Sequence, residues 1–379
     1  MSKFTVGFLI TDQHSGIGGL ENVLRSIVQG LAQRGVDSKL FFLQAPEEPR
    51  YLDQFEDCHL LPPMMAEPFP PFYPKFLRFQ LTKRRFNKKV LQLLSADFDI
   101  LIVLNISYYL LRSIPAIRKL QQERPHLPIV GWPHGSLTAI EPRIIEKLQK
   151  KGLPFTHYFA ISQGIQQELQ QYFSIPQSDI TLTYNPIPFP AHIPARNPTK
   201  FLYIGRVSSP GKRVVSLLHL LHQLQGEWSL DIYGSAGNEA EEQQFLLTIQ
   251  QLQLEARVTY HGWVQSPWSQ IQEAGVLLLN STSEGFPLVL AEAMSRGIPC
   301  ISSDCPTGPN EIIQEGINGW LYPVDQEDQC REILQDIIDH QRPLPSSHQV
   351  IESVKQFSEE AVMNHFQLTL EELINVTAP

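Results

Sequence analysis

The feature that most constrains the fold is an alternation of short apolar runs with helical patterns, which stops once and then begins again. In the first half, the apolar runs are residues 4–10, 40–43, 100–104, 128–132 and 158–161. Short buried strands separated by helices indicate a parallel sheet with helices on both faces. Near Asn185 a cluster of prolines, which regular elements exclude, interrupts the pattern.

The alternation resumes after the prolines. Its apolar runs are residues 201–204, 230–233, 258–260, 276–279 and 299–302, and its helical patterns are residues 214–224, 239–252 and 288–296. The sequence therefore predicts an α/β protein of two doubly wound, Rossmann-like domains, residues 1–187 and 188–356, that face a central cleft. Such sheets bind ligands beyond the carboxyl ends of their strands. The proline-rich segment 46–74 is interpreted as a loop insertion.

Charge is distributed unevenly along the chain. Residues 1–190 contain 20 Lys/Arg and 16 Asp/Glu, a balance of +4, whereas residues 191–379 contain 10 and 23, a balance of −13. The net charge of −9 disfavours a dedicated nucleic-acid-binding protein. No apolar run reaches the roughly 18 residues of a spanning helix, and no signal peptide is recognised. Together with four scattered cysteines, typical of cytosolic thiols, this predicts a cytoplasmic protein.

The strongest motif joins two acids in the second half. Glu284 follows the apolar run that ends at Leu279, and Gly285 and Pro287 predict a turn into the helix that contains Glu292. Backbone amides at such a turn bind anionic or hydroxyl-rich ligands. We expect both acids to face one ligand, such as a ribose diol and a sugar; the alternative is two surface glutamates on a capped helix.

Two cations stand just after the first strand of the second domain. Gly205 and Arg206 follow the apolar run directly, and Lys212 comes six residues after Arg206. Cations at the carboxyl end of a strand suit a diphosphate. The spacing from Gly205 to Lys212 does not match the phosphate loop of P-loop ATPases, so that class is disfavoured.

The first domain offers two weaker signals. Gly18 and Gly19 follow the first strand, where small residues let the backbone approach a phosphate or a sugar. Glu21 occupies the place of the third glycine of a dinucleotide fingerprint, which excludes that motif. His134 ends another predicted strand and points toward the expected cleft, where it could bond a substrate hydroxyl; a packed loop histidine is the alternative.

A metal site is not predicted. Asp97 and Asp99 form an Asp-x-Asp pair, but they precede the strand 100–104 at its amino end, opposite the expected site. We interpret the pair as a structural turn or cap. Elsewhere the sequence shows no cluster with metal-ligand spacing.

Residues 72–89 combine aromatic residues with seven cations and no acid. Phe72, Phe76 and Phe79 fall at helical spacing, an arrangement that suits the headgroup level of an anionic membrane. A helix that packs its aromatic residues on its own domain is the alternative, and single-stranded nucleic acid is disfavoured.

These motifs resemble those of retaining glycosyltransferases of family 4, which have the two-Rossmann GT-B fold. The resemblance rests on Gly205-Arg206 with Lys212, on residues 260–263, and above all on residues 280–309. Residues 132–134 and 184–186 are most similar to the subgroup of lipopolysaccharide-core sugar transferases, including galactosyltransferases. The resemblance implies a hexosyltransferase that moves galactose, or else glucose, from a UDP-sugar to a lipopolysaccharide-core acceptor.

The resemblance also implies roles for the matching residues. Arg206 and Lys212 would bind the donor diphosphate, and Glu292 the ribose. The donor sugar would be held by Glu284, Gly285, Phe286 and Pro287 and contacted by His134. The donor side would also include Gly18, Gly19 and Asn185, and a last helix, about 357–379, would pack back on the first domain. No cofactor or metal is implied, and loop 135–138 contains no acid to activate the acceptor.

Two alternatives stay open. The acceptor could be a polyprenyl-linked or capsular glycan intermediate, or the chain could be a UDP-sugar epimerase of similar architecture; a non-catalytic sugar-nucleotide binder is disfavoured by the intact set of charged residues. The 72–89 window and the implied acceptor predict a peripheral position on the cytoplasmic face of the inner membrane.

Overall fold

The computed structural model describes residues 4–13, 15, 18–62, 75–207 and 210–377. The chain divides into two units. The first contains residues 1–161, 165–186 and 362–379, and the second contains residues 162–164 and 187–361. The division thus falls between Pro186 and Ile187, beside the boundary of 187 and 188 inferred from the prolines.

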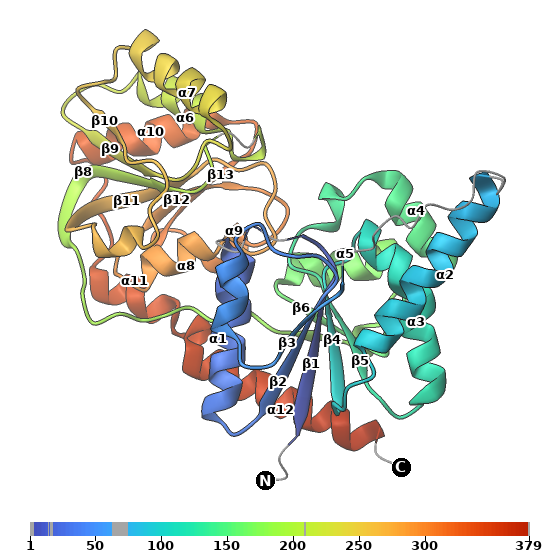
Figure 1. The fold of residues 1–379 in the computed structure, drawn as a ribbon. Coiled ribbons are helices and arrows are strands. Elements are labelled where there is room, and N and C mark those ends of the chain that lie inside the picture. Colours follow the sequence, from blue (N-terminus) through green and yellow to red (C-terminus); the bar gives the residue numbers. More distant parts are fainter. Residues whose placement is uncertain (1–3, 14, 16–17, 63–74, 208–209, 378–379) are drawn as a thin grey trace. The chain divides into compact units, whose positions relative to one another are not determined.

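The first unit is built on a parallel sheet of seven strands in the order β3-β2-β1-β4-β5-β6-β7, with helices on both faces (Figure 1). Its strands are β1 (Thr5–Ile10), β2 (Asp37–Phe42), β3 (Cys58–Leu60), β4 (Ile100–Leu104), β5 (Ile129–Trp132), β6 (His157–Ala160) and β7 (Ile180–Leu182). Its helices include α1 (Gly19–Gln33), α2 (Lys75–Leu93), α3 (Tyr108–Glu123), α4 (Pro142–Lys151) and α5 (Gln163–Phe173). Every residue of β4 is buried, as its unbroken apolar sequence predicts.

The segment 46–74 is more regular than the sequence suggested. A 3-10 helix, η1 (Pro49–Gln54), and strand β3 lie within it, and β3 pairs in parallel with β2 at the edge of the sheet. The interpretation of the whole segment as a loop insertion was therefore wrong for residues 49–60, because three residues of strand leave too little pattern to recognise. Residues 63–74 lie outside the described residues.

The last helix, α12 (Glu359–Thr377), joins the first unit from Val362 onward. Figure 1 shows it running past the strands of this unit beside α1. Its Phe366 is fully buried against the rings of Trp132 and Phe159, with ring centres 5.6 Å and 5.4 Å away. A side chain at Gly30 of α1 would collide with Met363, so the glycine permits the close approach of the two helices.

The second unit contains a parallel sheet of six strands in the order β10-β9-β8-β11-β12-β13. Its strands are β8 (Ala195–Ile204), β9 (Ser229–Tyr233), β10 (Val258–Tyr260), β11 (Glu273–Leu279), β12 (Cys300–Asp304) and β13 (Gly319–Pro323). Its helices are α6 (Val214–Leu221), α7 (Glu239–Gln251), α8 (Leu288–Met294), α9 (Pro309–Ile312), α10 (Glu327–Ile338) and α11 (Ser347–Ser353). The predicted class, α/β with two Rossmann-like sheets, is confirmed.

Each sheet has one place where the order of strands reverses. In the first unit the chain builds outward from β1 to β2 and β3, then returns to place β4 on the other side of β1. In the second unit β11 returns in the same way to the free side of β8. The loops that leave two such neighbouring strands diverge, and ligands of open parallel sheets bind there.

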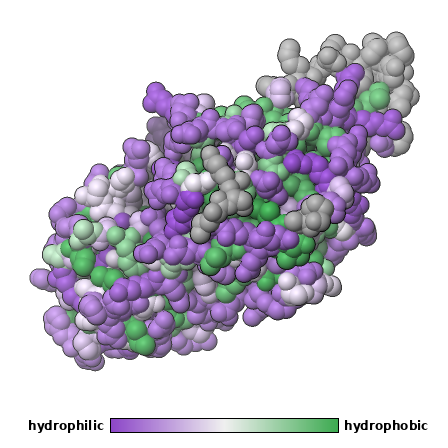
Figure 2. All heavy atoms as spheres, turned by 90° about the horizontal axis from the view of Figure 1, so that it is seen from below, coloured by the Kyte–Doolittle hydropathy of each residue, from purple (hydrophilic) through white to green (hydrophobic). Residues whose placement is uncertain are grey.

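Figure 2 shows one face of the molecule, on which polar residues dominate and hydrophobic residues form small separate groups. Within the described ranges, no helix has both the length and the apolar character that crossing a membrane requires.

Candidate functional site

The reversal point of the second unit brings three predicted residues to one edge of its sheet. Arg206 lies just past the end of β8, and Lys212 ends a 3-10 turn, η4 (Pro210–Lys212), in the same loop. Glu284 lies in the loop that follows β11. The Lys212 ammonium is 2.5 Å from an Oε1 of Glu284, with 23% and 11% of the two side chains exposed.

Arg206 differs from its neighbouring cations. Its side chain is exposed and makes no ion pair with an acid in the described part of the chain, whereas Lys212 pairs with Glu284 and Arg213 with Glu327. Its backbone carbonyl accepts a hydrogen bond from the buried hydroxyl of Tyr203, 3.1 Å away. An anchored backbone with an unpaired guanidinium suits an incoming anion.

The loop that contains Lys212 is tied to the loop that follows β11. The Gly211 carbonyl accepts a hydrogen bond from the backbone N–H of Thr282 at 2.8 Å. Arg213, the next residue after Lys212, has a left-handed backbone with φ of 50°. Such a conformation is costly for a residue with a side chain unless its surroundings hold it in place.

A buried polar network supplies that support. Asn280 is fully buried; its amide donates to the Arg213 carbonyl at 3.3 Å and to the Glu327 carboxylate at 2.8 Å. Its own oxygen accepts from the hydroxyl of Tyr322 at 2.7 Å. The guanidinium of Arg213 pairs with the same Glu327 and also donates to the carbonyl of Val324. The network therefore holds the backbone beside Lys212.

The Glu284 turn is supported from the loop after β12. The Thr307 hydroxyl donates to the carbonyl of Glu284, and Gly308 has φ of 93°. A side chain at Gly308 would collide with Pro287, so only glycine permits this close approach. Phe286 is buried, with its ring centre 5.2 Å from that of Phe357. The Phe286 ring therefore belongs to the core of the second unit.

Glu292 lies in α8 and has a different partner from Glu284. The indole N–H of Trp268, in the 3-10 turn η5 (Pro267–Ser269), donates to Oε2 of Glu292 at 2.9 Å. Arg296 donates to the Glu292 carbonyl at 2.7 Å and lies 4.5 Å above the Trp268 ring. Burial raises the pKa of Glu292, and the Trp268 hydrogen bond and the Arg296 charge oppose that rise.

In the first unit, Gly18 and Gly19 lie where α1 begins, after the loop that leaves β1. Gly18 is the N-cap, and a side chain there would collide with the Glu21 carboxylate, 2.5 Å from the added carbon. Glu21 is buried and accepts a hydrogen bond from the Ser15 hydroxyl at 2.9 Å. The acid that replaces the third glycine therefore has a structural role, and its carboxylate packs closely against Gly18.

His134 follows β5, two strands away from β1 in the sheet. Its backbone N–H donates to Oδ1 of Asn105, which follows β4. The His134 ring is half-buried, with its centre 4.2 Å from that of the buried Trp132.

The loop after His134 receives an acid from another element. Glu168 of α5 is buried and accepts hydrogen bonds from the Ser136 hydroxyl and the Leu137 backbone N–H, each at 2.6 Å. Loop 135–138 has no acid of its own, so the sequence did not reveal this contact. Because both oxygens of Glu168 bind the loop, the carboxylate fixes its shape.

Asn185 lies apart from Gly18 and His134. It follows β7, the edge strand of the first sheet, four places from β1 in the strand order. Strands lie about 4.8 Å apart, so roughly 19 Å of sheet separates β7 from β1. Asn185 is buried, and its Oδ1 has no hydrogen-bond donor in the described part of the chain.

The basic, aromatic-rich segment 72–89 supplies most of α2. Phe72 lies outside the described residues, as do the side chains of Phe76 and Phe79, so the predicted aromatic face stays a prediction. Further along, Phe86 is buried beneath Arg112, whose guanidinium lies 4.8 Å from the ring centre. Partial burial and the charges of Lys83 and Arg118 lower the pKa of Lys151, which places cations of α2, α3 and α4 within electrostatic reach of one another.

The Asp97–Asp99 pair lies at the amino edge of the first sheet, as predicted. Asp99 accepts a hydrogen bond from the Thr5 backbone N–H at 2.7 Å and so caps β1.

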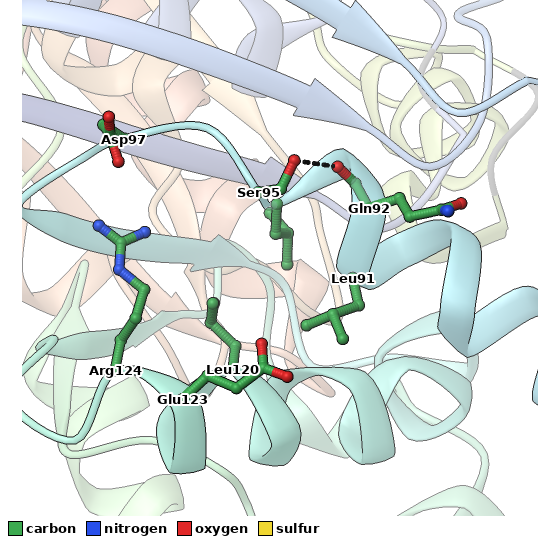
Figure 3. Close-up of a pocket in the computed structure, with 8 residues that line it drawn as sticks. Leu91, Gln92, Ser95, Asp97, Leu120, Glu123 and Arg124 are labelled. Atoms are coloured by element: carbon green, nitrogen blue, oxygen red, sulfur yellow. Dashed lines mark hydrogen bonds between the residues drawn. The ribbon is translucent and has the colours of Figure 1, made fainter.

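Nearby, α2 and α3 enclose a hollow of about 380 Å³, toward which Leu91 and Leu120 point (Figure 3). Arg124, at one end, donates to the carbonyls of Ala96 and Phe98. The hollow lies away from the carboxyl ends of the strands, and its lining contains none of the predicted site residues.

No three His, Cys, Asp or Glu side chains gather into a possible metal site within the ranges that the structure describes. The expectation that the reaction needs no metal stays a prediction.

Several supporting residues were not predicted. They are Tyr203, Asn280, Glu327, Trp268, Arg296, Thr307, Glu21 and Glu168. One signal was present in the sequence: Asn280 is the first polar residue after an apolar strand, next to the Glu284 motif. The others become visible only when distant segments come together.

The chain is similar to known proteins over nearly its whole length. The family described as glycosyltransferase family 4 matches residues 17–189, and the one described as glycosyl transferases group 1 matches residues 189–357. A lipopolysaccharide 1,6-galactosyltransferase of Salmonella typhimurium is 32% identical over 320 residues, 81% of this chain and 82% of that protein. Its counterpart in Escherichia coli K12 is 31% identical, with the same coverage.

Solved structures show the same likeness. The apo form of the lipopolysaccharide outer core galactosyltransferase WaaB has a TM-score of 0.76 and 27% identity, covering 97% of this chain and 99% of that one. The Anabaena protein HepE in complex with UDP-glucose has a TM-score of 0.74 at 17% identity, covering 97% of this chain and 100% of that one, which is a likeness of fold alone.

Proposed function

The chain belongs to the group 1 glycosyl transferases and is a hexosyltransferase, and from this premise we propose that it transfers a hexose from a UDP-sugar to the core oligosaccharide of lipopolysaccharide. Galactose is our first choice of sugar and glucose the second. The proposed acceptor is supported by the two relatives that are 32% and 31% identical, because both are lipopolysaccharide 1,6-galactosyltransferases.

The observation that carries the donor assignment is the convergence of Arg206, Lys212 and Glu284 at the reversal point of the second sheet. An exposed guanidinium and an ammonium at one strand edge suit the two phosphates of UDP. An ammonium has three hydrogen-bond donors, so Lys212 can keep its ion pair with Glu284 and bind a phosphate oxygen at the same time. Glu284 and the backbone of Gly285 and Phe286 are then beside the diphosphate, where the donor sugar begins.

We further propose that transfer retains the α configuration of the sugar. The leaving β-phosphate takes the proton of the acceptor hydroxyl on the face from which it departs, and the residues of this chain stabilise the charge that develops on the diphosphate. Glu168 supports the β-phosphate as the proton acceptor, because both oxygens of this carboxylate already accept hydrogen bonds from loop 135–138.

With two cations at the diphosphate, no metal is needed, and turnover should persist in excess EDTA. Loss of turnover that magnesium restores would contradict this.

The peripheral position is a proposal that rests on α2. Lys83, Arg84, Arg85, Lys88 and Lys89 lie along this helix, and cations of α3 and α4 lie near its Lys83. We propose that this surface contacts anionic lipid on the cytoplasmic face of the inner membrane, where the acceptor would be found.

One experiment tests the function directly. The chain is incubated with labelled UDP-galactose, UDP-glucose and UDP-N-acetylglucosamine, each with truncated lipopolysaccharide, with polyprenyl-linked glycan and with no acceptor, and the products are identified. Transfer of one hexose to lipopolysaccharide with an α linkage is expected. Transfer only to the polyprenyl-linked glycan would replace the acceptor, and conversion of a UDP-sugar without acceptor would indicate an epimerase.

A further inference from the structure

Trp268 forms a side-chain hydrogen bond with Glu292, and the proposed function gives Trp268 no role. The two side chains come from different segments of the second unit, η5 and α8, and meet at 2.9 Å through the indole N–H and Oε2. An indole has one donor and no acceptor. The other oxygen of Glu292, Oε1, accepts no hydrogen bond from the described residues. One oxygen is thus held by the chain and the other is available.

A carboxylate on a helix can turn about its side-chain torsions, and binding a ribose diol requires one orientation. The Trp268 hydrogen bond selects that orientation before the ligand arrives, which lowers the conformational cost of binding. Arg296 completes the arrangement, because its guanidinium lies over the indole ring while donating to the Glu292 backbone. The indole of Trp268 thus contacts both the Arg296 guanidinium and the Glu292 carboxylate.

We propose that Trp268 is a positioning residue that orients Glu292 toward the ribose hydroxyls of the donor and thereby makes the enzyme select ribonucleotides over 2′-deoxyribonucleotides. The inference rests on the proposed function, since it takes Glu292 as the ribose ligand. Burial raises the pKa of Glu292, and the hydrogen bond from the indole N–H lowers it. The indole N–H therefore has a second effect besides orientation: it favours the ionised carboxylate, the form that accepts hydrogen bonds from hydroxyls.

The test compares the binding of UDP and of 2′-deoxy-UDP by titration calorimetry, together with steady-state kinetics. The variant Trp268→Phe removes the N–H and keeps an aromatic ring for Arg296. We expect the wild type to prefer UDP about tenfold, as for a lost hydrogen bond to a charged group. In Trp268→Phe the preference should fall to about twofold. The KM for the UDP-sugar should rise about fivefold to tenfold with kcat changed less than about twofold, since ribose binding is equal in ground and transition states.

Trp228→Phe is a matched control. Trp228, like Trp268, lies beneath an arginine: the Arg257 guanidinium is 5.0 Å from its ring centre. Trp228 is buried, its N–H has no acceptor in the described part of the chain, and it lies at the amino end of β9. This variant should keep the wild-type preference. Trp268→His, which returns a ring N–H, should recover part of the preference lost in Trp268→Phe, and it serves as a second measurement if the phenylalanine variant unfolds.

The outcomes separate the inference from the proposed function. If Glu292→Gln loses the preference for UDP and Trp268→Phe keeps it with an unchanged KM, the positioning role of Trp268 is wrong while the ribose site stands. If Glu292→Gln itself binds UDP and 2′-deoxy-UDP as the wild type does, the assignment of Glu292 to the ribose is wrong. Equal loss of preference in Trp228→Phe would also overturn the inference, because the effect would then be one of general packing.

Discussion

The ammonium of Lys212 lies 2.5 Å from Oε1 of Glu284, although 72 positions separate the two residues in the sequence. The contact joins the loop after β8 to the loop after β11, so one pair links a predicted diphosphate ligand to a predicted sugar ligand. Only 11% of the Glu284 side chain is exposed, so its charge depends on Lys212 for compensation.

Removing Lys212 alone should therefore destabilise the second unit. In Lys212→Ala the carboxylate of Glu284 stays partly buried without its cation, and we expect a loss of about 1–3 kcal/mol in the free energy of unfolding. The double variant Lys212→Ala/Glu284→Gln should recover at least about 0.5 kcal/mol of that loss. Urea unfolding of the two single variants and the double variant measures this, and strictly additive effects would show that the pair is not coupled.

Arg206→Ala should remove most turnover and leave the fold intact. The side chain is exposed and has no acidic partner in the described part of the chain, so its loss disturbs little packing. A preorganised donor at a developing charge is worth about 10²–10³ in rate. Steady-state kinetics and a thermal melt check both parts, with Arg331→Ala on α10 as the control. Near-wild-type turnover would contradict the diphosphate role.

Asn280→Ala should affect both stability and rate. The substitution removes the partner of Tyr322 and one donor to Glu327, and leaving buried polar groups without partners costs about 1–3 kcal/mol. Because the backbone of Arg213 then loses a contact beside Lys212, kcat/KM should fall about tenfold or more. Urea unfolding and kinetics measure the two effects. A large loss of stability with unchanged kcat/KM would show that the network does not position Lys212.

The raised pKa of Glu292 predicts a pH-dependent stability. Burial favours the protonated form in the folded chain, so this glutamate contributes stability below its ordinary pKa of about 4.3, and the contribution is lost as the pH rises through the raised value. Replacing the acid by Glu292→Gln removes this dependence. The stability of the variant relative to the wild type should therefore increase from about pH 4 upward and then level off. Urea unfolding across this range checks it, and a constant difference would contradict the raised pKa.

Neutralising the basic residues of α2 should weaken binding to anionic vesicles. The variant replaces four cations by glutamine: Lys83, Arg84, Arg85 and Lys88. Each cation near such a surface contributes about 1 kcal/mol, so partitioning should fall at least about tenfold in sedimentation with phosphatidylglycerol vesicles. A matched control neutralises four cations outside α2: Lys39, Arg50, Arg331 and Lys355. Equal loss in both variants would indicate a general charge effect and no specific role for α2.

Most of the architecture could be predicted because it depends on local patterns. An unbroken apolar run such as Ile100–Leu104 is buried on both faces of a parallel sheet wherever it lies, and helical spacing identifies the segments that cover it. The short strands β3, β7 and β13 were not predicted. Two of them have three residues, and β13 begins with glycine and ends with proline, so none shows a period.

The candidate site also contains residues that the sequence could place and partners that it could not. Arg206, Lys212 and Glu284 could be placed from the sequence because each follows an apolar strand, and parallel strands end at one edge. The partners could not be placed. Glu168 reaches loop 135–138 from α5, and Trp268 reaches Glu292 from η5, across separations that no local pattern spans.

The sequence by itself determined two parallel sheets, the loops that leave their strands and the charged residues on those loops, because apolar period and proline and glycine positions act over a few residues. Only the tertiary structure decided which charges are compensated and which carboxylate oxygens are occupied. Packing of whole elements brings a donor within 3 Å of its acceptor. That difference leaves Arg206 exposed without an acidic partner in the described chain, while Lys212 lies beside Glu284 and Trp268 beside Glu292.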